Sequence, residues 1–179
     1  MSEYKQSLKY SMERLAEDPR VIFLGYGVRT GGRALGTLKD IPDSQLLEMP
    51  VAEGLMIGAA LGLSLAGRLP VVFIERMDFL MNAMDALVNH LDKLEAISRG
   101  EFHPSVLVRC VVGNRSKPLF TGETHTQDFT AALELMLKMP VVRLTGLGSI
   151  RDTFDKRNFM QREGLPPGNL LTVEYKDLH

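Results

Sequence analysis

A nearly uncharged stretch, Met49 to Gly67, constrains the fold of this chain more than any other part of its sequence. It carries one acid, Glu53, and no further charge before Arg68. Pro50 suits the approach to a helix, because proline presets φ and a first-turn residue needs no N–H donor. A helix that is apolar on every face is buried, either in a membrane or inside a protein. We therefore predict a buried helix that begins near Glu53 and ends near Gly67.

Small residues recur at every fourth position of this predicted helix, so Gly54, Gly58, Gly62 and Ala66 share one side. Each interior glycine costs roughly 0.5–1 kcal/mol relative to alanine. A helix with three glycines on one side is therefore expected to pack closely against a second backbone. Glu53 stands at its first turn, where the helix dipole favours an anion and burial opposes it. Two interpretations stay open: Glu53 complements the dipole, or it is a functional carboxylate.

The composition indicates one globular domain over residues 1–179, because 45% of the residues are hydrophobic and the net charge is −1. The sequence has no basic stretch of the kind that indicates nucleic-acid binding. A membrane span needs about 20 apolar residues, and the Met49–Gly67 run is shorter and diluted by glycine, so no membrane span is expected. Cys110 is the single cysteine, and the N-terminus lacks the pattern of a signal peptide, so we expect a cytoplasmic protein.

Short apolar runs alternate with helical patterns along the chain. Strands are predicted at Val21–Val28, Leu69–Glu75, Ser105–Val112, Pro140–Leu144 and Leu170–Tyr175, and further helices at Tyr4–Ala16, Asp78–Ser98, Phe129–Leu137 and Ile150–Arg162. This alternation predicts a three-layer α/β fold around a mostly parallel sheet. Arg109 lies inside the third predicted strand and would need a partner, because an unpaired buried charge is costly.

Three other features were weighed as functional signals. The segment Gly25–Gly32 could cradle a dinucleotide pyrophosphate, but only if a helix followed it directly, and the sequence predicts a loop there. His125 lies in the long polar loop after the third predicted strand, where sites in open α/β sheets often form, although an isolated loop histidine is usually only solvated. Asp85, Asn89 and Lys93 form a polar row, for which a solvated face with a weak Asp–Lys network is the simple interpretation. The histidines are scattered, so no metal site is expected.

The segments EDPRVIFLGYGV, MPVAEGLMIGAALGLSLAGRLPVV, DFLMNAMDALVNHLDKL, GETHTQDF and VEYKDLH together resemble one known family. The chain is similar to the pyrimidine-binding domain of thiamine-diphosphate enzymes, and most similar to the N-terminal half of the beta subunit of pyruvate and branched-chain 2-oxo acid dehydrogenases. The spacing of Glu53, Gly58 and Gly62 matches the family's cofactor signature. The resemblance implies the thiamine-diphosphate-binding fold and thiamine diphosphate as the cofactor.

The resemblance also implies roles for individual residues. Glu53 matches the carboxylate that hydrogen-bonds a ring nitrogen of the cofactor's aminopyrimidine and favours its imino tautomer. Phe79 matches an aromatic residue that lies against the pyrimidine ring, with simple core packing as the alternative. His125, in a His-Thr-Gln stretch, matches the histidine of the family's His-Ser-Gln, which faces the substrate. Asp85, Asn89 and Lys93 match a structural row near the subunit contact.

Two departures from the family pattern bear on function. Leu63 stands where many relatives have glutamine, and the diphosphate and magnesium motif Gly-Asp-Gly is absent from the sequence. The resemblance therefore implies half of an active site, with Mg²⁺ held by a diphosphate-binding partner subunit and a homodimer or hetero-oligomer formed through the Gly54/Gly58/Gly62 side of the helix. The expected reaction uses a 2-oxo acid. A transketolase-type two-carbon transfer and a non-catalytic scaffold or regulatory role are the alternatives.

Overall fold

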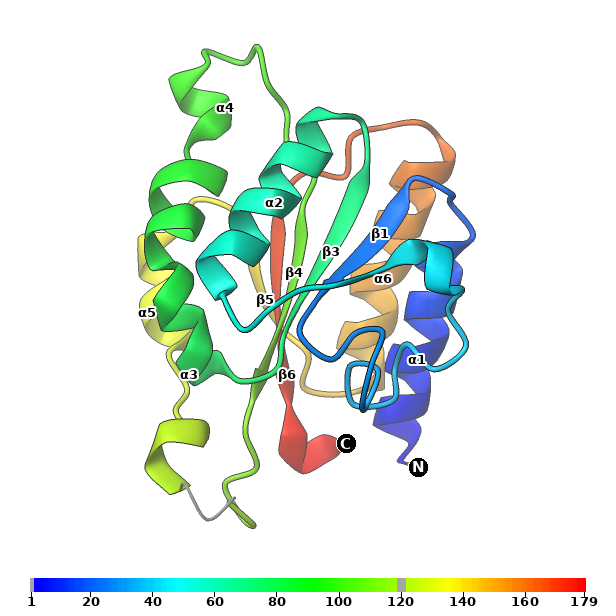
Figure 1. Ribbon diagram of the computed structural model, residues 1–179, viewed down its shortest axis with the longest axis vertical. Coiled ribbons are helices and arrows are strands. Elements are labelled where there is room, and N and C mark those ends of the chain that lie inside the picture. Colours follow the sequence, from blue (N-terminus) through cyan, green and yellow to red (C-terminus); the bar gives the residue numbers. More distant parts are fainter. Residues whose placement is uncertain (1, 119–121) are drawn as a thin grey trace.

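A computed structural model describes residues 2–118 and 122–179 and shows one parallel sheet with helices on both faces (Figure 1). Its strand order is β2-β1-β3-β4-β6-β5, and every neighbouring pair is parallel. The strands are β1 (Val21–Gly25), β2 (Leu46–Glu48), β3 (Leu69–Ile74), β4 (Leu107–Val112), β5 (Val141–Arg143) and β6 (Leu170–Tyr175). The predicted three-layer α/β fold is confirmed.

Helices cover the sheet in two groups. They are α1 (Glu3–Ala16), α2 (Glu53–Leu65), α3 (Met77–Leu80), α4 (Leu94–Ile97), α5 (Thr130–Met136) and α6 (Leu147–Arg162), with 3-10 turns at Asp43–Gln45, Met81–Ala83, Gly122–His125 and Lys176–Leu178 and a π-helix at Asp85–Leu91. Helices α1 and α6 pack on one face, and α2, the α3–α4 segment and α5 lie over the other (Figure 1). Strand β3 serves both layers, because Val71 and Phe73 point to the first and Val72 and Ile74 to the second.

Two predicted elements differ from the structure, and one strand was not predicted. The predicted helix Asp78–Ser98 is not one α-helix, because a 3-10 turn and a π-helix interrupt it. Its far end is fixed by the Asp92 carboxylate, which accepts backbone N–H bonds from Lys138 (2.9 Å) and Met139 (2.7 Å). Strand β1 ends at Gly25 instead of Val28, since Gly25 has φ +151° and a Cβ there would lie 2.5 Å from the carbonyl oxygen of Phe73. Strand β2 was missed, because only Leu46 and Leu47 mark it, whereas the equally short β5 lies in the mostly apolar run Pro140–Leu144.

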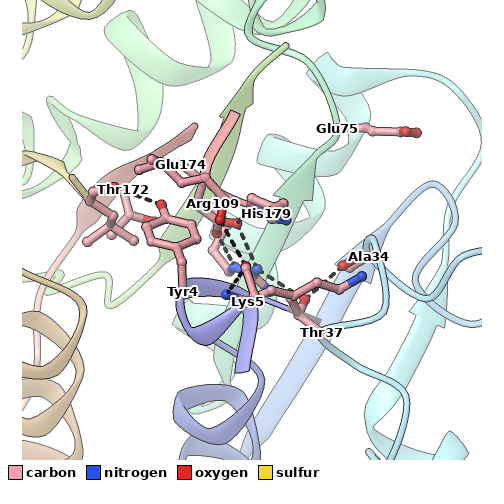
Figure 2. A network of polar contacts seen from close by, with 12 residues as sticks. Tyr4, Lys5, Ala34, Thr37, Glu75, Arg109, Thr172, Glu174 and His179 are labelled. Carbon is pink, nitrogen blue, oxygen red and sulfur yellow. Dashed lines mark hydrogen bonds and ion pairs between the residues drawn. The ribbon is translucent and has the colours of Figure 1, made fainter. Parts of the chain in front are cut away.

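Arg109 has the partner that its burial requires. Its Nε donates to Oε1 of Glu174 at 2.7 Å and its Nη2 to Oε2 at 3.1 Å, and both side chains are fully buried (Figure 2). Both terminal nitrogens also donate to Oγ1 of Thr37 at 3.1 Å. The Arg109 guanidinium lies 5.5 Å from the ring centre of Phe73, and Nε2 of His179 lies 3.5 Å from Oε2 of Glu174. The ion pair therefore joins β4 to β6 and to the loop after β1.

Acid is expected to destabilise the fold between about pH 4.5 and pH 2. Burial raises the pKa of Glu174, but the charges of Arg109 and His179 and their hydrogen bonds outweigh it and hold the pKa at about 2, below its ordinary value of 4.5. Because the pKa is lower in the folded chain, this stabilisation is complete above the unfolded-state pKa and is lost as the pH falls towards the folded-state value. Denaturant unfolding across this pH range measures the effect. If the free energy of unfolding of the double variant Arg109→Met/Glu174→Leu fell equally steeply over this pH range, the result would contradict the role of Glu174.

No helix in the described ranges is both long enough and apolar enough to cross a bilayer.

Candidate active site

A cavity of about 260 Å³ opens at the carboxyl edge of the sheet, between the ends of β1 and β3 and the start of α2. Loops and helix starts at this edge of a parallel sheet are where ligands bind in open α/β folds. Two residues singled out from the sequence, Glu53 and Phe79, line this cavity together. The rest of its wall comes from Tyr26, Val51, Met56, Phe73, Ile74 and Glu75.

Glu53 is the first residue of α2 and is only 6% exposed. Among the described residues, the side chain that donates to it is Asn82, whose Nδ2 lies 3.4 Å from Oε2, a long hydrogen bond. The position in the first turn agrees with the dipole interpretation. The cavity adds a second fact, because a buried carboxylate with one weak donor facing an open cavity has acceptor capacity left for a ligand.

Phe79 and His125 lie against each other at the side of this cavity. Their ring centroids are 5.1 Å apart and their planes meet at 88°, an edge-to-face contact. Phe79 both lines the cavity and packs against the core, a position that agrees with either of its two interpretations. His125 is half-buried and stands behind Phe79 and not among the residues that line the cavity.

The loop that carries His125 is held onto α3 and β4 by specific contacts. Nε2 of Gln127 donates to Oδ1 of Asp78 at 2.8 Å, and the backbone N–H of Phe129 lies 3.0 Å from the sulfur of Met77. A Cβ at Gly113 would lie 1.7 Å from the backbone oxygen of His125, so only glycine lets the loop pass this close to the end of β4. Gly113 thus fixes where His125 lies.

The glycine-rich segment after β1 already holds an anion of its own. The Glu48 carboxylate accepts backbone N–H bonds from Gly27 (2.6 Å), Arg29 (2.8 Å) and Thr30 (3.1 Å). Burial raises the pKa of Glu48, but these donors outweigh it and hold the pKa below its ordinary value. The N–H groups that a pyrophosphate would need are therefore occupied, and turns follow in place of a helix. The structure does not support the dinucleotide interpretation.

Two residues of the polar row, Asp85 and Asn89, lie exposed on the π-helix, and Lys93 follows it half-buried. Nδ2 of Asn89 donates to Oδ1 of Asp85 at 2.9 Å, whereas Lys93 pairs with Asp92. The predicted Asp–Lys network between Asp85 and Lys93 is therefore not what forms. Within residues 2–118 and 122–179, no three His, Cys, Asp or Glu side chains gather in a way that could hold a metal ion.

Helix α2 is only partly buried within this chain. A Cβ at Gly54 would meet the backbone oxygen of Asn82 at 3.4 Å, so that glycine does approach a second backbone. Gly58 and Gly62 are exposed, and nothing lies within 4 Å of a Cβ built there. The apolar side chain of Leu55 is 54% exposed and that of Leu65 is 47% exposed. An apolar face of α2 thus stays open.

Sequence reasoning missed three contributors to this site: Tyr26, Asn82 and Gly113. Tyr26 directly follows β1, so its place after a parallel strand was the signal that could have found it. Asn82 is three residues after Phe79, within the segment that was read as one regular helix. Gly113 had no signal beyond following an apolar run, because its role depends on a backbone contact with His125, 12 residues later in the loop that Gly113 begins.

Comparison with known proteins gives a family match over most of the chain. Residues 4–143 match the family described as "Transketolase, pyrimidine binding domain". A relative from Pseudomonas aeruginosa named "2-oxoisovalerate dehydrogenase subunit beta" is 31% identical over 144 residues, which are 75% of this chain and 40% of the relative. "Pyruvate dehydrogenase E1 component subunit beta, mitochondrial" from Dictyostelium discoideum is 27% identical over 66% of this chain and 34% of its own length.

A solved structure described as "Split gene transketolase, inactive beta4 tetramer" shares the fold, with a TM-score of 0.67 over 97% of this chain and 50% of that one at 16% identity. The chain therefore spans half or less of the length of these relatives.

Proposed function

Because this chain belongs to the transketolase pyrimidine-binding family, we propose that it supplies the pyrimidine-binding half of a thiamine-diphosphate active site, acting on a 2-oxo acid. The observation that carries this proposal is the buried carboxylate of Glu53, which faces a cavity that it shares with the ring of Phe79. The names of the relatives from Pseudomonas aeruginosa and Dictyostelium discoideum support a 2-oxo acid over a two-carbon ketose donor.

The residues around the cavity fit an aminopyrimidine ring. A largely apolar cavity of about 260 Å³ accepts a flat heteroaromatic ring, and the phenyl group of Phe79 offers it a surface for stacking. Glu53 Oε1 or Oε2 would share a proton with a ring nitrogen, for which Asn82 is a weak competitor at 3.4 Å. When bound, thiamine diphosphate supplies a nucleophilic carbon for attack on the substrate carbonyl.

His125 is assigned to the substrate side of this site. Its Nδ1 lies 3.0 Å from Oγ1 of Thr124, so Nε2 is the ring nitrogen that we assign to the substrate. A histidine donor there would hold a carboxylate or carbonyl oxygen of the substrate, or carry a proton to it. Its contact with Phe79 couples the position of this donor to the ring that would stack on the cofactor.

The other half of the site is assigned to a partner chain. The sequence has no Gly-Asp-Gly motif, and the described residues hold no candidate metal cluster. The diphosphate and Mg²⁺ are therefore expected on a diphosphate-binding subunit, an arrangement that the description of the split-gene transketolase supports.

The isolated chain is expected to bind thiamine diphosphate weakly, because it offers the pyrimidine ring a cavity but gives the diphosphate no metal site. Titration calorimetry with Mg²⁺ and thiamine diphosphate measures this, first on the chain alone and then after addition of a chain that carries Gly-Asp-Gly. Saturable binding should appear with the second chain. Tight binding by the isolated chain would contradict the half-site proposal.

The open face of α2 is proposed as the subunit contact. Glycines at Gly58 and Gly62 would let a second helix approach closely, and Leu55 and Leu65 add exposed apolar area beside them. An exposed apolar helix face of this kind is typical of a protein–protein contact. We therefore expect another subunit to cover the open face of α2.

Substitutions at Gly58 separate folding from assembly. Gly58→Ala should raise the free energy of unfolding of the isolated chain by about 0.5–1 kcal/mol, since nothing lies within 4 Å of the new Cβ. Gly58→Leu should leave the fold intact and break the assembly, as seen by sedimentation. Gly148→Leu, at an open glycine on α6, is the matched control. Unchanged assembly of the Gly58→Leu protein would remove α2 from the contact.

A further inference from the structure

A second cavity, of about 300 Å³, lies at the edge of the sheet opposite Glu53. It opens between α6, the start of β5 and the start of β6, where Pro140 and Asn169 precede these two strands. Most of its wall is apolar, from Pro140, Val142, Met160, Pro167 and Leu170. The proposed cofactor half-site makes no use of this region.

Arg157 is the buried charged residue of the cavity wall and is 3% exposed. Its Nη1 donates to the backbone oxygen of Gly168 and its Nη2 to that of Ser105, both at 3.1 Å. Its Nε–H has no acceptor among the described residues. Burial alone lowers the pKa of Arg157 to about 10, with no carboxylate acting against it.

This situation contrasts with that of the other buried arginine. Arg109 is neutralised by Glu174 within the chain, whereas no described acid forms an ion pair with Arg157. Asp152 lines the same cavity without pairing with Arg157. A buried cation without a counter-charge costs several kcal/mol, and an anion that reaches it recovers part of that cost.

The remaining polar groups of the wall are already satisfied. Oγ1 of Thr153 donates to the backbone oxygen of Ser149 at 2.7 Å. The Asn169 amide accepts from the N–H of Val106 and donates to the oxygen of Leu91, both at 3.0 Å. The charged groups left to recognise a ligand are therefore Arg157, the exposed Lys156 and the exposed Asp152, two cations against one acid.

We propose that this cavity binds a small organic carboxylate with an apolar body, its anionic head placed against Arg157 and Lys156 and its hydrocarbon part among Val142, Met160 and Leu170. The apolar wall excludes a bare hydrated anion as the preferred ligand, and the uncompensated guanidinium excludes a neutral hydrocarbon. The volume suits a small molecule, because it lies at the lower end of the range of about 300–1,000 Å³ that is typical of small-molecule pockets.

The test uses 4-methylpentanoate as the probe and its neutral amide, 4-methylpentanamide, as the matched ligand. Titration calorimetry and ligand-observed NMR on the whole chain should show that the carboxylate binds. A thermal melt should show that it raises the midpoint temperature of unfolding. The amide should bind at least about tenfold more weakly, because it lacks the charge-assisted hydrogen bond. Acetate and inorganic phosphate, which lack the apolar body, should also bind more weakly.

Two variants localise the binding. Arg157→Met removes the charge and keeps a side chain of similar length, whereas Val142→Phe fills the cavity and leaves Arg157 in place. Each variant should weaken the binding of 4-methylpentanoate by about tenfold or more. Arg151→Met, an exposed arginine on α6 that does not line the cavity, should change nothing. Equal binding of amide and carboxylate, binding of phosphate in preference, retention of binding by the Val142→Phe protein, or no binding at millimolar probe would each overturn the proposal.

Discussion

Glu53→Gln is expected to lower turnover by the assembled enzyme by about 10²–10⁴-fold, the usual contribution of a positioned acid–base group. The substitution keeps the shape of the side chain and removes the proton that the carboxyl group would share with the cofactor ring. The fold should survive, because Glu53 receives only the 3.4 Å hydrogen bond from Asn82 among the described residues and pairs with no described cation. Loss of activity without loss of stability is therefore the expected result.

The control for this experiment is Glu3→Gln. Glu3 is the first-turn acid of α1, as Glu53 is of α2, so both variants remove the same interaction with a helix dipole. Only the Glu53 variant should lose activity, measured as steady-state turnover of the complete complex and compared with its unfolding midpoint. Full activity of the Glu53→Gln enzyme would refute the proposed chemistry and favour a scaffold or regulatory role for this chain.

Glu174→Leu is expected to lower the free energy of unfolding by about 3–5 kcal/mol, because it leaves Arg109 buried and unpaired. Among the described residues, the guanidinium would retain Oγ1 of Thr37 and the face of the Phe73 ring. Phe73 also lines the cavity with Glu53, so strain at Arg109 should reach the candidate site as well. Equilibrium unfolding in denaturant, with the slope compared between variants, gives the stability loss.

The double variant Arg109→Met/Glu174→Leu separates two quantities: the contribution of the ion pair to the free energy of unfolding, and the cost of leaving one buried charge unpaired. Replacing both partners with apolar side chains should restore most of the stability lost in the single variant, since apolar replacements of buried pairs are often neutral or stabilising. Arg143→Met, which removes the exposed pair with Glu134, is the control and should cost about 1 kcal/mol or less. A double variant as unstable as the single one would show that the pair itself supplies the stability.

Much of the fold could be predicted because its signals are local. Each buried strand of five or six residues was predicted from a short apolar run, and α1 and α6 were predicted from helical patterns. Strand β2 was missed because only two apolar residues, Leu46 and Leu47, mark it in the sequence. The Asp78–Ser98 segment was predicted as one α-helix because apolar residues at every fourth position, such as Ala83, Leu87 and Leu91, do not distinguish an α-helix from a π-helix. The sequence predicted a buried α2 with its glycine side against a second backbone, but an apolar sequence does not say which chain covers that side.

The sequence by itself determined the alternation of strands and helices, and it placed a lone acid at the head of an apolar helix, because these features are encoded within a few neighbouring residues. Tertiary structure alone decided that Arg109 meets Glu174, 65 residues away, and that Glu48 occupies the glycine-rich loop. It also decided that Glu53 and Phe79 face one cavity while Arg157 faces another without a counter-charge. Such contacts depend on how distant segments pack, and packing is set by the whole chain at once.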